Sequence, residues 1–169
     1  MNAQHQSYMQ QALQQATLAL AEREFPVGCV LVADGEIVAR GRRRNSRAQS
    51  LAELDHAEIV ALRSLAASSQ KWRPPLIAYA TMEPCLMCFS TLLLNGVTTV
   101  VYAFEDAMGG GTGLPLHQLP PLYQQLMPTV IGGICRSESL ALFRRFFANP
   151  ANEYWQDSLL ANYTMEQKP

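Results

Sequence analysis

Two short segments of the chain carry side chains that can bind a metal ion. Residues 56–58 read His-Ala-Glu, and residues 84–88 read Pro-Cys-Leu-Met-Cys. We expect each segment to begin a helix, where Cys85 and Cys88 share one face and the free N–H groups favour the thiolate form that binds zinc. The proline suits this place because its missing N–H would have no partner in the first helical turn. Together the segments predict a Zn²⁺ site with His56 as the third ligand.

A zinc site with one histidine and two cysteines is expected to be catalytic. Structural zinc sites usually have four protein ligands, whereas catalytic sites have three and leave the fourth position to water. Water at such a position ionises near neutral pH, and a nearby carboxylate can accept and pass on its proton. Glu58 follows His56 by two residues. We therefore expect Glu58 to be the catalytic proton carrier and not a ligand.

Two other interpretations stay open from the residues alone. A lone Cys-x-x-Cys pair is also typical of closed zinc sites and of redox pairs. A zinc-stabilised binding module without catalysis would need the three ligands only. Neither alternative gives Glu58 a role, and a redox pair would leave His56 without one as well.

The remaining cysteines and two further histidines are weaker candidates for a fourth ligand. Cys29 and Cys135 lie in or beside predicted apolar strands, where a buried thiol is the commoner state. His5 lies near the N-terminus and His117 follows a glycine-rich loop, so we expect both side chains to face solvent. We expect no fourth protein ligand.

Hydrophobic patterning predicts the elements that position these residues. Helices are expected at residues 7–23, 56–67, 85–94, 119–126, 137–147 and 151–163, and strands at 27–33, 36–41, 76–81, 97–104 and 129–134. Asp34-Gly35 is a strong hairpin signal between the first two strands. Asp55 and Ser137 are the expected N-caps of the helices that follow them. The pattern predicts an α/β fold with a mixed sheet of about five strands and helices on both faces.

Composition narrows the class of protein. The 169 residues fit a single domain over residues 1–169. The net charge of −1 provides no overall field for a polyanion. No apolar run is long enough to span a membrane and the N-terminus lacks the features of a signal peptide, so we expect a cytoplasmic protein without membrane contact. Five arginines lie within residues 40–47; they suit a solvated loop, which we favour, or a grip on a phosphate group.

Residues 56–58 and 84–88 resemble the zinc signature of the cytidine/deoxycytidylate deaminase-like superfamily. Residues 25–32 and 81–85 and the pair Phe146-Phe147 are also similar to bacterial tRNA adenosine deaminases and to related guanine and cytosine deaminases. The likeness covers roughly residues 8–148. It implies a three-layer αβα sandwich, zinc on the three ligands named above, and hydrolytic removal of an exocyclic amine as ammonia with Glu58 as proton carrier. It also implies a homodimer.

The resemblance leaves the substrate open between small nucleobase compounds and tRNA. The tRNA-acting members carry an Asn two residues after the Gly that ends the second strand, whereas here Gly41 is followed by Arg42 and Arg43 and the nearest Asn is Asn45. Residues 148–150 also lack the basic side chains that would suit RNA. We therefore favour a free nucleobase, nucleoside or nucleotide as substrate, with adenosine in tRNA as the alternative.

Several further site features are implied by the resemblance. Substrate contacts are expected from Phe25, Asn45, Trp155 and Ala57, the last through its backbone amide. Residues 149–169 are expected to form a C-terminal extension whose aromatic side chains either cover the active site or pack on the domain. The glycine-rich loop over residues 108–113 is either a pocket wall or a mobile connection.

Overall fold

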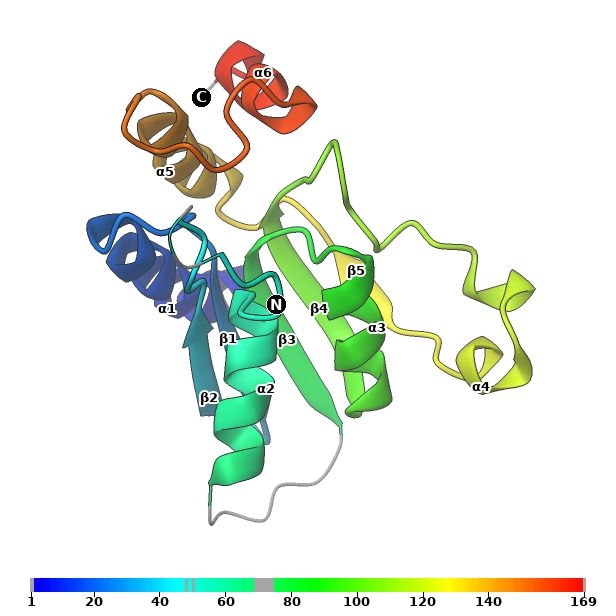
Figure 1. The fold of residues 1–169 in the computed structure, drawn as a ribbon. Helices are drawn as coiled ribbons and strands as arrows, with labels where there is room; N and C mark the ends of the chain where they lie inside the picture. The colour runs from blue at the N-terminus through cyan, green and yellow to red at the C-terminus, as the bar shows by residue number, and fades with distance from the viewer. Residues whose placement is uncertain (1, 48, 50, 69–74, 169) are drawn as a thin grey trace.

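The computed structural model describes residues 2–47, 49, 51–68 and 75–168 (Figure 1). Its helical elements are α1 (Asn2–Ala21), α2 (Ala57–Ala67), α3 (Leu86–Leu94), the 3₁₀ turn η2 (Leu116–Gln118), α4 (Pro121–Gln124), α5 (Arg136–Phe147) and α6 (Leu159–Glu166). Its strands are β1 (Gly28–Ala33), β2 (Glu36–Arg42), β3 (Leu76–Met82), β4 (Val97–Phe104) and β5 (Thr129–Ile131).

The strands form one mixed, five-stranded sheet in the order β2-β1-β3-β4-β5. β1 pairs antiparallel with both β2 and β3, whereas β3, β4 and β5 run parallel. The hairpin between β1 and β2 turns at Asp34 and Gly35, which have φ values of 50° and 80°, and such a turn matches the twist of the flanking strands. The expected α/β class with a mixed sheet is confirmed.

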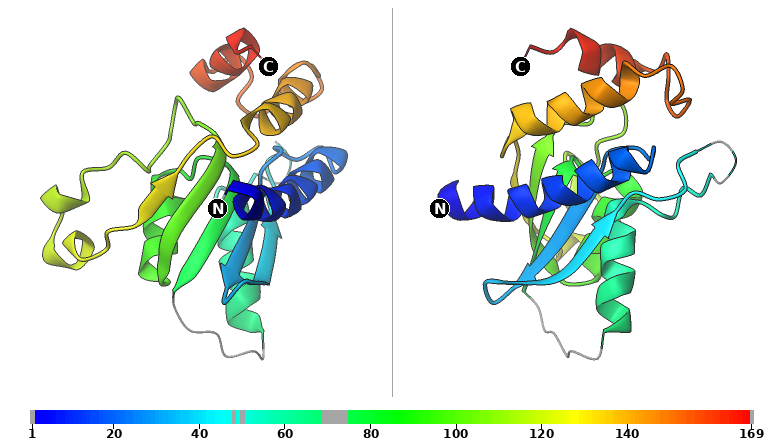
Figure 2. Two further views of the ribbon diagram at one scale, coloured as in Figure 1. Left: turned by 180° about the vertical axis from the view of Figure 1, so that it is seen from behind. Right: turned by 90° about the vertical axis from the view of Figure 1, so that its left-hand side faces the viewer.

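Helices cover both faces of the sheet (Figure 2). α1 packs on one face and α2 and α3 pack on the other, while α5 contacts α1 and β4. The alternation of side chains along β1 explains how both faces are filled. Val30 and Val32 join the core beneath α1, and Cys29 and Leu31 join the core beneath α2 and α3. A strand buried on both faces reads as a continuous apolar run, as β1 does.

One edge of the sheet collects the elements that carry the chemistry. β3 ends at Met82 and β4 ends at Phe104, and parallel strands bring these carboxyl ends to the same edge. Cys85 follows β3 within three residues, and α2 starts beside it with His56 as its N-cap. Ligands of open α/β sheets bind at the carboxyl ends of strands. The fold therefore predicts a binding site at this edge of the sheet.

Two predicted helix caps are wrong. His56, and not Asp55, is the N-cap of α2, because the Asp55 carboxylate instead accepts hydrogen bonds from Asn45 Nδ2 at 2.6 Å and Arg63 Nη1 at 2.9 Å. Cys135, and not Ser137, precedes α5, in the left-handed conformation with φ 58°.

The C-terminal segment differs from its prediction. The last helix begins only at Leu159, because the Ser158 side chain accepts a hydrogen bond from Ala161 N and so caps it there. Tyr154 and Trp155 therefore lie in turns that precede the helix. β5 is also shorter than the expected strand, and α1 begins earlier than expected. Residues 48 and 50 of the expected loop over 42–55 lie outside the described residues.

None of the helices in the described ranges combines the length and the apolar character that crossing a membrane requires.

Candidate active site

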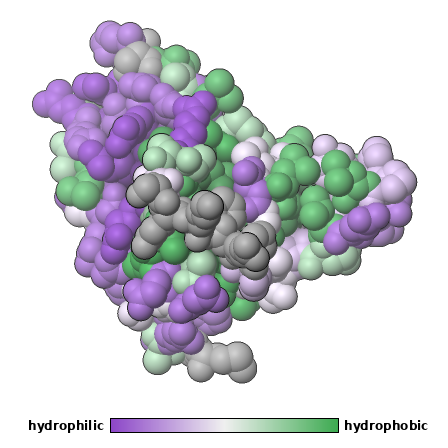
Figure 3. Space-filling model, turned by 90° about the horizontal axis from the view of Figure 1, so that it is seen from below, coloured by the Kyte–Doolittle hydropathy of each residue, from purple (hydrophilic) through white to green (hydrophobic). Residues whose placement is uncertain are grey.

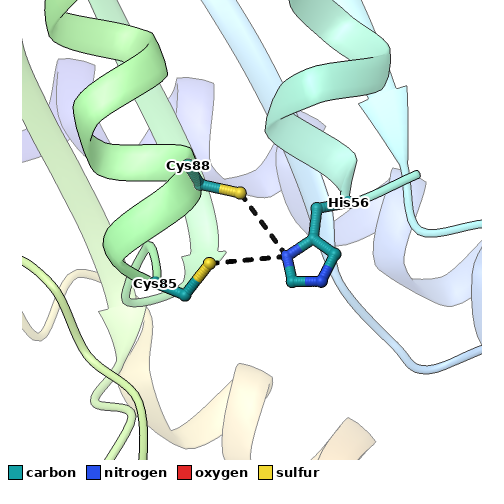
Figure 4. A group of neighbouring side chains, drawn as sticks. All are labelled: His56, Cys85 and Cys88. Atoms are coloured by element: carbon teal, nitrogen blue, oxygen red, sulfur yellow. Dashed lines mark hydrogen bonds between the residues drawn. The ribbon is translucent and has the colours of Figure 1, made fainter. Parts of the chain in front are cut away.

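The three predicted zinc ligands lie together at the edge of the sheet (Figure 4). His56 Nδ1 is 3.4 Å from the sulfur of Cys88 and 3.7 Å from the sulfur of Cys85. All three ligand atoms lie within 4.8 Å of one another. Cys85 is the N-cap of α3 and Cys88 lies in its first turn, so one helix start supplies both sulfurs and the start of α2 supplies the imidazole.

The chemistry of this donor set fits zinc. Thiolate sulfur and imidazole nitrogen are the ligands that zinc prefers. Hydrogen bonds from the Cys88 thiol and His56 lower the pKa of Cys85 to about 4, so the thiolate form is available at neutral pH. Within the described part of the chain, no other His, Cys, Asp or Glu side chain belongs to this group. The site is therefore a zinc site with three protein ligands, the composition typical of catalytic centres.

Glu58 occupies the position expected of a proton carrier. It lies in the first turn of α2, two residues after His56, and only 3% of it is exposed. Burial raises the pKa of its carboxyl above the ordinary value of 4.5. Glu58 lines the same cavity as His56 and Cys85, so it borders the space in which a substrate would bind beside the metal.

The cavity at this site has a volume of about 310 Å³, within the usual size of small-molecule sites. Its lining joins segments that are far apart in the sequence, including the end of β3, the start of α2 and the C-terminal segment. The residues beside the metal ligands and Glu58 are Phe25, Val27, Arg43, Glu53, Ala57, Met82, Glu83, Asp106, Met108, Gly109, Tyr154, Trp155 and Leu160. The apolar members are suited to the faces of a flat ring, and the polar members to its edges.

The glycine-rich segment after β4 forms one wall of the cavity. Met108 and Gly109 line the cavity, and Gly111 N donates to Pro84 O at 2.8 Å. Glu83 holds the segment in place, since its carboxylate accepts hydrogen bonds from Asp106 N at 3.2 Å and Thr112 N at 3.3 Å. Of the two interpretations left open for this segment, the structure favours the wall.

Three of the four expected substrate-contact residues line the cavity. They are Phe25, Ala57 and Trp155. Asn45 is not among the lining residues, because its amide is directed to Asp55. Trp155 is 45% exposed, and its ring packs against the ring of Tyr154 with centroids 5.5 Å apart. That these four residues bind a substrate stays a prediction.

Arg43 is the principal residue of the cavity that is not among the expected site residues. The expectation of a solvated arginine loop is wrong here, because Arg43 is only 1% exposed and lines the cavity. Its neighbours in the cluster pair with acidic groups, Arg42 with Glu22 and Arg47 with Glu24. The available signal was its position two residues after Gly41, where the resemblance described above implies an Asn.

Within the described residues, none of the weaker ligand candidates belongs to the metal-binding group, although one differs from its prediction. Cys29 is fully buried in β1, and neither it nor Cys135 belongs to the metal-binding group. His117 is exposed as expected. His5 is half-buried in α1 with its Nδ1 2.9 Å from the Tyr79 hydroxyl, so the prediction of a solvated side chain is wrong.

Comparisons with known proteins agree with this geometry. The model of the cytidine and deoxycytidylate deaminase zinc-binding region matches residues 2–104. The tRNA-specific adenosine deaminase of Agrobacterium fabrum strain C58 is 32% identical over 148 residues, which cover 86% of this chain and 95% of that protein. A solved structure of a tRNA:A34 deaminase, from work on A-to-I editing at the wobble position of transfer RNA, has a TM-score of 0.68 and 30% identity. It covers 80% of this chain and 98% of that chain.

Other relatives match over a shorter length. The tRNA-specific adenosine deaminase of Streptococcus pyogenes serotype M18 is 37% identical over 105 residues, which cover 62% of this chain and 65% of the relative. The chain thus spans less than two thirds of the streptococcal relative's length.

Proposed function

The chain belongs to the cytidine and deoxycytidylate deaminase zinc-binding family, and on this premise we propose that it is a hydrolytic deaminase that removes the exocyclic amine of a nucleobase and releases ammonia. The main evidence for this proposal is the position of Glu58. It is a buried carboxyl group on the wall of the cavity that also contains His56 and Cys85. A purely structural zinc site has no use for such a group.

Each residue of the cavity has its own role in the proposed reaction. His56, Cys85 and Cys88 would hold the zinc ion, and the ion would supply a water molecule activated as a nucleophile near neutral pH. Phe25 and Trp155, which both line the cavity, would contact the ring of the base, and the backbone amide of Ala57 would bind its edge. Glu58 takes one proton of the attacking water as the new C–O bond forms and delivers it to the ring nitrogen. It then takes the proton of the newly added hydroxyl and delivers it to the exocyclic amine as the C–N bond breaks and the C=O bond forms. The amine leaves as ammonia.

The substrate we infer is an adenosine in tRNA. The relatives at 32% and 37% identity are both tRNA-specific adenosine deaminases. These relatives support the tRNA substrate better than the small nucleobase compound that the sequence alone favours. The cavity contains enough space for one base, and the rest of an RNA would lie outside it.

A free nucleobase, nucleoside or nucleotide is the second candidate, and one observation favours it. Tyr154, Trp155 and Leu160 of the C-terminal segment line the cavity, so this segment encloses part of the space that a base would occupy. A small substrate would gain contacts from such enclosure, whereas an RNA strand must still enter.

Ammonia release tests these candidates directly. The zinc-loaded protein is incubated with a tRNA anticodon stem-loop, adenosine, cytidine, deoxycytidylate, guanine and cytosine. We expect turnover of the stem-loop with conversion of adenosine to inosine. Turnover of a small compound alone would replace the tRNA proposal by the second candidate. No ammonia from any of the six would contradict the deaminase proposal for these substrate classes.

The homodimer implied by the resemblance is also a proposal, and the surface supports it. The segment that carries η2 and α4 projects from the rest of the molecule and presents hydrophobic side chains (Figure 3). Leu122 and Met127 are exposed at 57% and 72%. Apolar side chains gathered on a projecting segment are typical of protein–protein contact. Light scattering coupled to gel filtration should give the mass of two chains, and the mass of one chain would contradict the dimer.

A further inference from the structure

We propose that Glu53 positions the zinc ligand His56, and that Arg43 and Tyr154 hold Glu53 in place for this task. The proposal rests on the metal site and not on the identity of the substrate. It assigns a role to three residues that line the cavity but are neither metal ligands nor the proton carrier.

The two nitrogens of the His56 ring face different partners. Nδ1 faces the sulfurs of Cys85 and Cys88, and Nε2 lies 3.2 Å from Glu53 Oε2. A carboxylate that accepts the Nε2–H fixes the tautomer with its free lone pair on Nδ1, and it also fixes the orientation of the ring. Glu53 is thus placed to present Nδ1 to the metal.

Burial does not hold the Glu53 side chain, since 52% of it is exposed. Hydrogen-bond donors hold it instead. Arg43 Nη2 donates to Oε2 at 3.2 Å, and the Tyr154 hydroxyl donates to Oε2 at 3.0 Å and to Oε1 at 3.3 Å. With His56, three side chains from three separate segments therefore converge on a single carboxylate.

Arg43 is itself firmly fixed. Its side chain is only 2% exposed, its Nη1 donates to Ala52 O at 3.0 Å, and its guanidinium lies 5.3 Å from the centre of the Tyr154 ring. Its buried Nε has no hydrogen-bond partner. A buried cation with an unsatisfied donor lowers the stability of the folded state, and the pairing with Glu53 offsets part of this loss. Tyr154 extends the network to the C-terminal segment.

Zinc affinity tests the proposal without any substrate. Zinc dissociation constants are measured by competition with a chromophoric chelator for wild type, E53A and E53Q. Removing a carboxylate that orients a ligating histidine typically weakens metal binding about 10- to 100-fold, and we expect a loss of this size in E53A. E53Q keeps an oxygen that accepts the Nε2–H, so it should recover most of the affinity.

Two further variants complete the experiment. E153A removes an exposed carboxylate that lines the same surface hollow as Glu53 and Tyr154, and its zinc affinity should equal that of wild type. Y154F removes the hydroxyl and keeps the ring, and it should weaken zinc binding less than E53A does. Circular dichroism in the presence of chelator establishes that each variant is folded, and Y154F carries the test if E53A does not fold.

The outcomes separate this proposal from the proposed function. Wild-type zinc affinity in folded E53A overturns the role of Glu53. Wild-type zinc affinity in Y154F overturns the proposal that Tyr154 holds Glu53 in place for this task. An equal loss of zinc affinity in E53A and E153A also overturns the proposal, because removal of a negative charge alone would then explain the effect. Failure of every substrate would contradict the deaminase proposal and leave these affinities unaffected.

Discussion

Gly41 of β2 lies so close to Ala57 of α2 that a methyl group on Gly41 would meet the Ala57 carbonyl oxygen at 2.1 Å. It would also meet Ala61 N at 2.5 Å. The backbone of α2 therefore rests directly on β2. Because His56 and Glu58 are carried by the start of this helix, the absence of a side chain at Gly41 helps to set the position of the metal ligand and of the proposed proton carrier.

Replacement of this glycine should disturb both stability and zinc binding. In Gly41→Ala the new methyl group must displace the helix backbone, and we expect the free energy of unfolding to fall by about 1–3 kcal/mol together with weaker zinc binding. Urea denaturation and chelator competition measure the two effects. Gly113→Ala is the matched control, because nothing lies within 4 Å of a methyl group there. Equal stability of the two variants would contradict the close-packing argument.

The C-terminal helices are tied to the end of β4 through Glu105. Arg136 Nε donates to Glu105 Oε2 at 2.8 Å, Arg136 Nη2 donates to Oε1, and the Tyr163 hydroxyl donates to Oε1 at 2.6 Å. The hydrogen bond from Arg136 is the main reason that the pKa of Glu105 falls from 4.5 to about 2. Because the pKa is lower in the folded state, the ionised pair stabilises the fold above the unfolded pKa of about 4.5, and this contribution is lost as the pH falls towards 2.

Glu105→Gln should therefore show a pH-dependent loss of stability. At pH 7 we expect its free energy of unfolding to be lower than that of wild type by about 1.5–3 kcal/mol, the range for hydrogen bonds to charged groups. The difference should shrink below pH 4.5, measured down to the lowest pH at which both proteins fold. Glu166→Gln, an exposed position on α6, should match wild type throughout. A difference that stays constant with pH would contradict the assignment to Glu105.

Trp155 should contribute to substrate binding more than to turnover. Its ring lines the cavity while 45% of the residue is exposed, so its removal should leave the fold intact. Stacking of a base on an aromatic ring is worth about 1–3 kcal/mol, so we expect Trp155→Ala to raise KM at least about fivefold with kcat little changed. Leu159→Ala alters the same segment at an exposed position outside the cavity lining, and its KM should match wild type. Equal KM values for all three proteins would remove Trp155 from the proposed substrate site.

The sequence alone predicts the parts of this structure that depend on local patterns. Short apolar runs rich in β-branched residues predict the strands, and Asp34-Gly35 predicts the hairpin between the first two. The zinc ligands can also be predicted from the sequence, because their spacing is fixed within short segments. Cys85 and Cys88 are joined by one helix start, and His56 begins the neighbouring helix.

Contacts between distant segments could not be predicted in the same way. Arg43 is charged and lies within a run of arginines, and only its contacts with Glu53 and with Tyr154, far along the chain, explain why it is buried. Asp55 has the residue type of a good N-cap, but Asn45 and Arg63 compete for its carboxylate. In each case a tertiary partner decides the outcome, and no periodicity identifies that partner.

The most direct test of the central claim uses Glu58→Gln and wild type purified in parallel. Zinc content is measured by mass spectrometry and ammonia release is measured on the same preparations. We predict one zinc ion per chain in both proteins and a loss of turnover in Glu58→Gln of about 10²- to 10⁴-fold, the usual contribution of a positioned proton carrier. A zinc-loaded Glu58→Gln protein that retains the wild-type rate, or a wild-type protein that releases ammonia without bound zinc, would contradict the account.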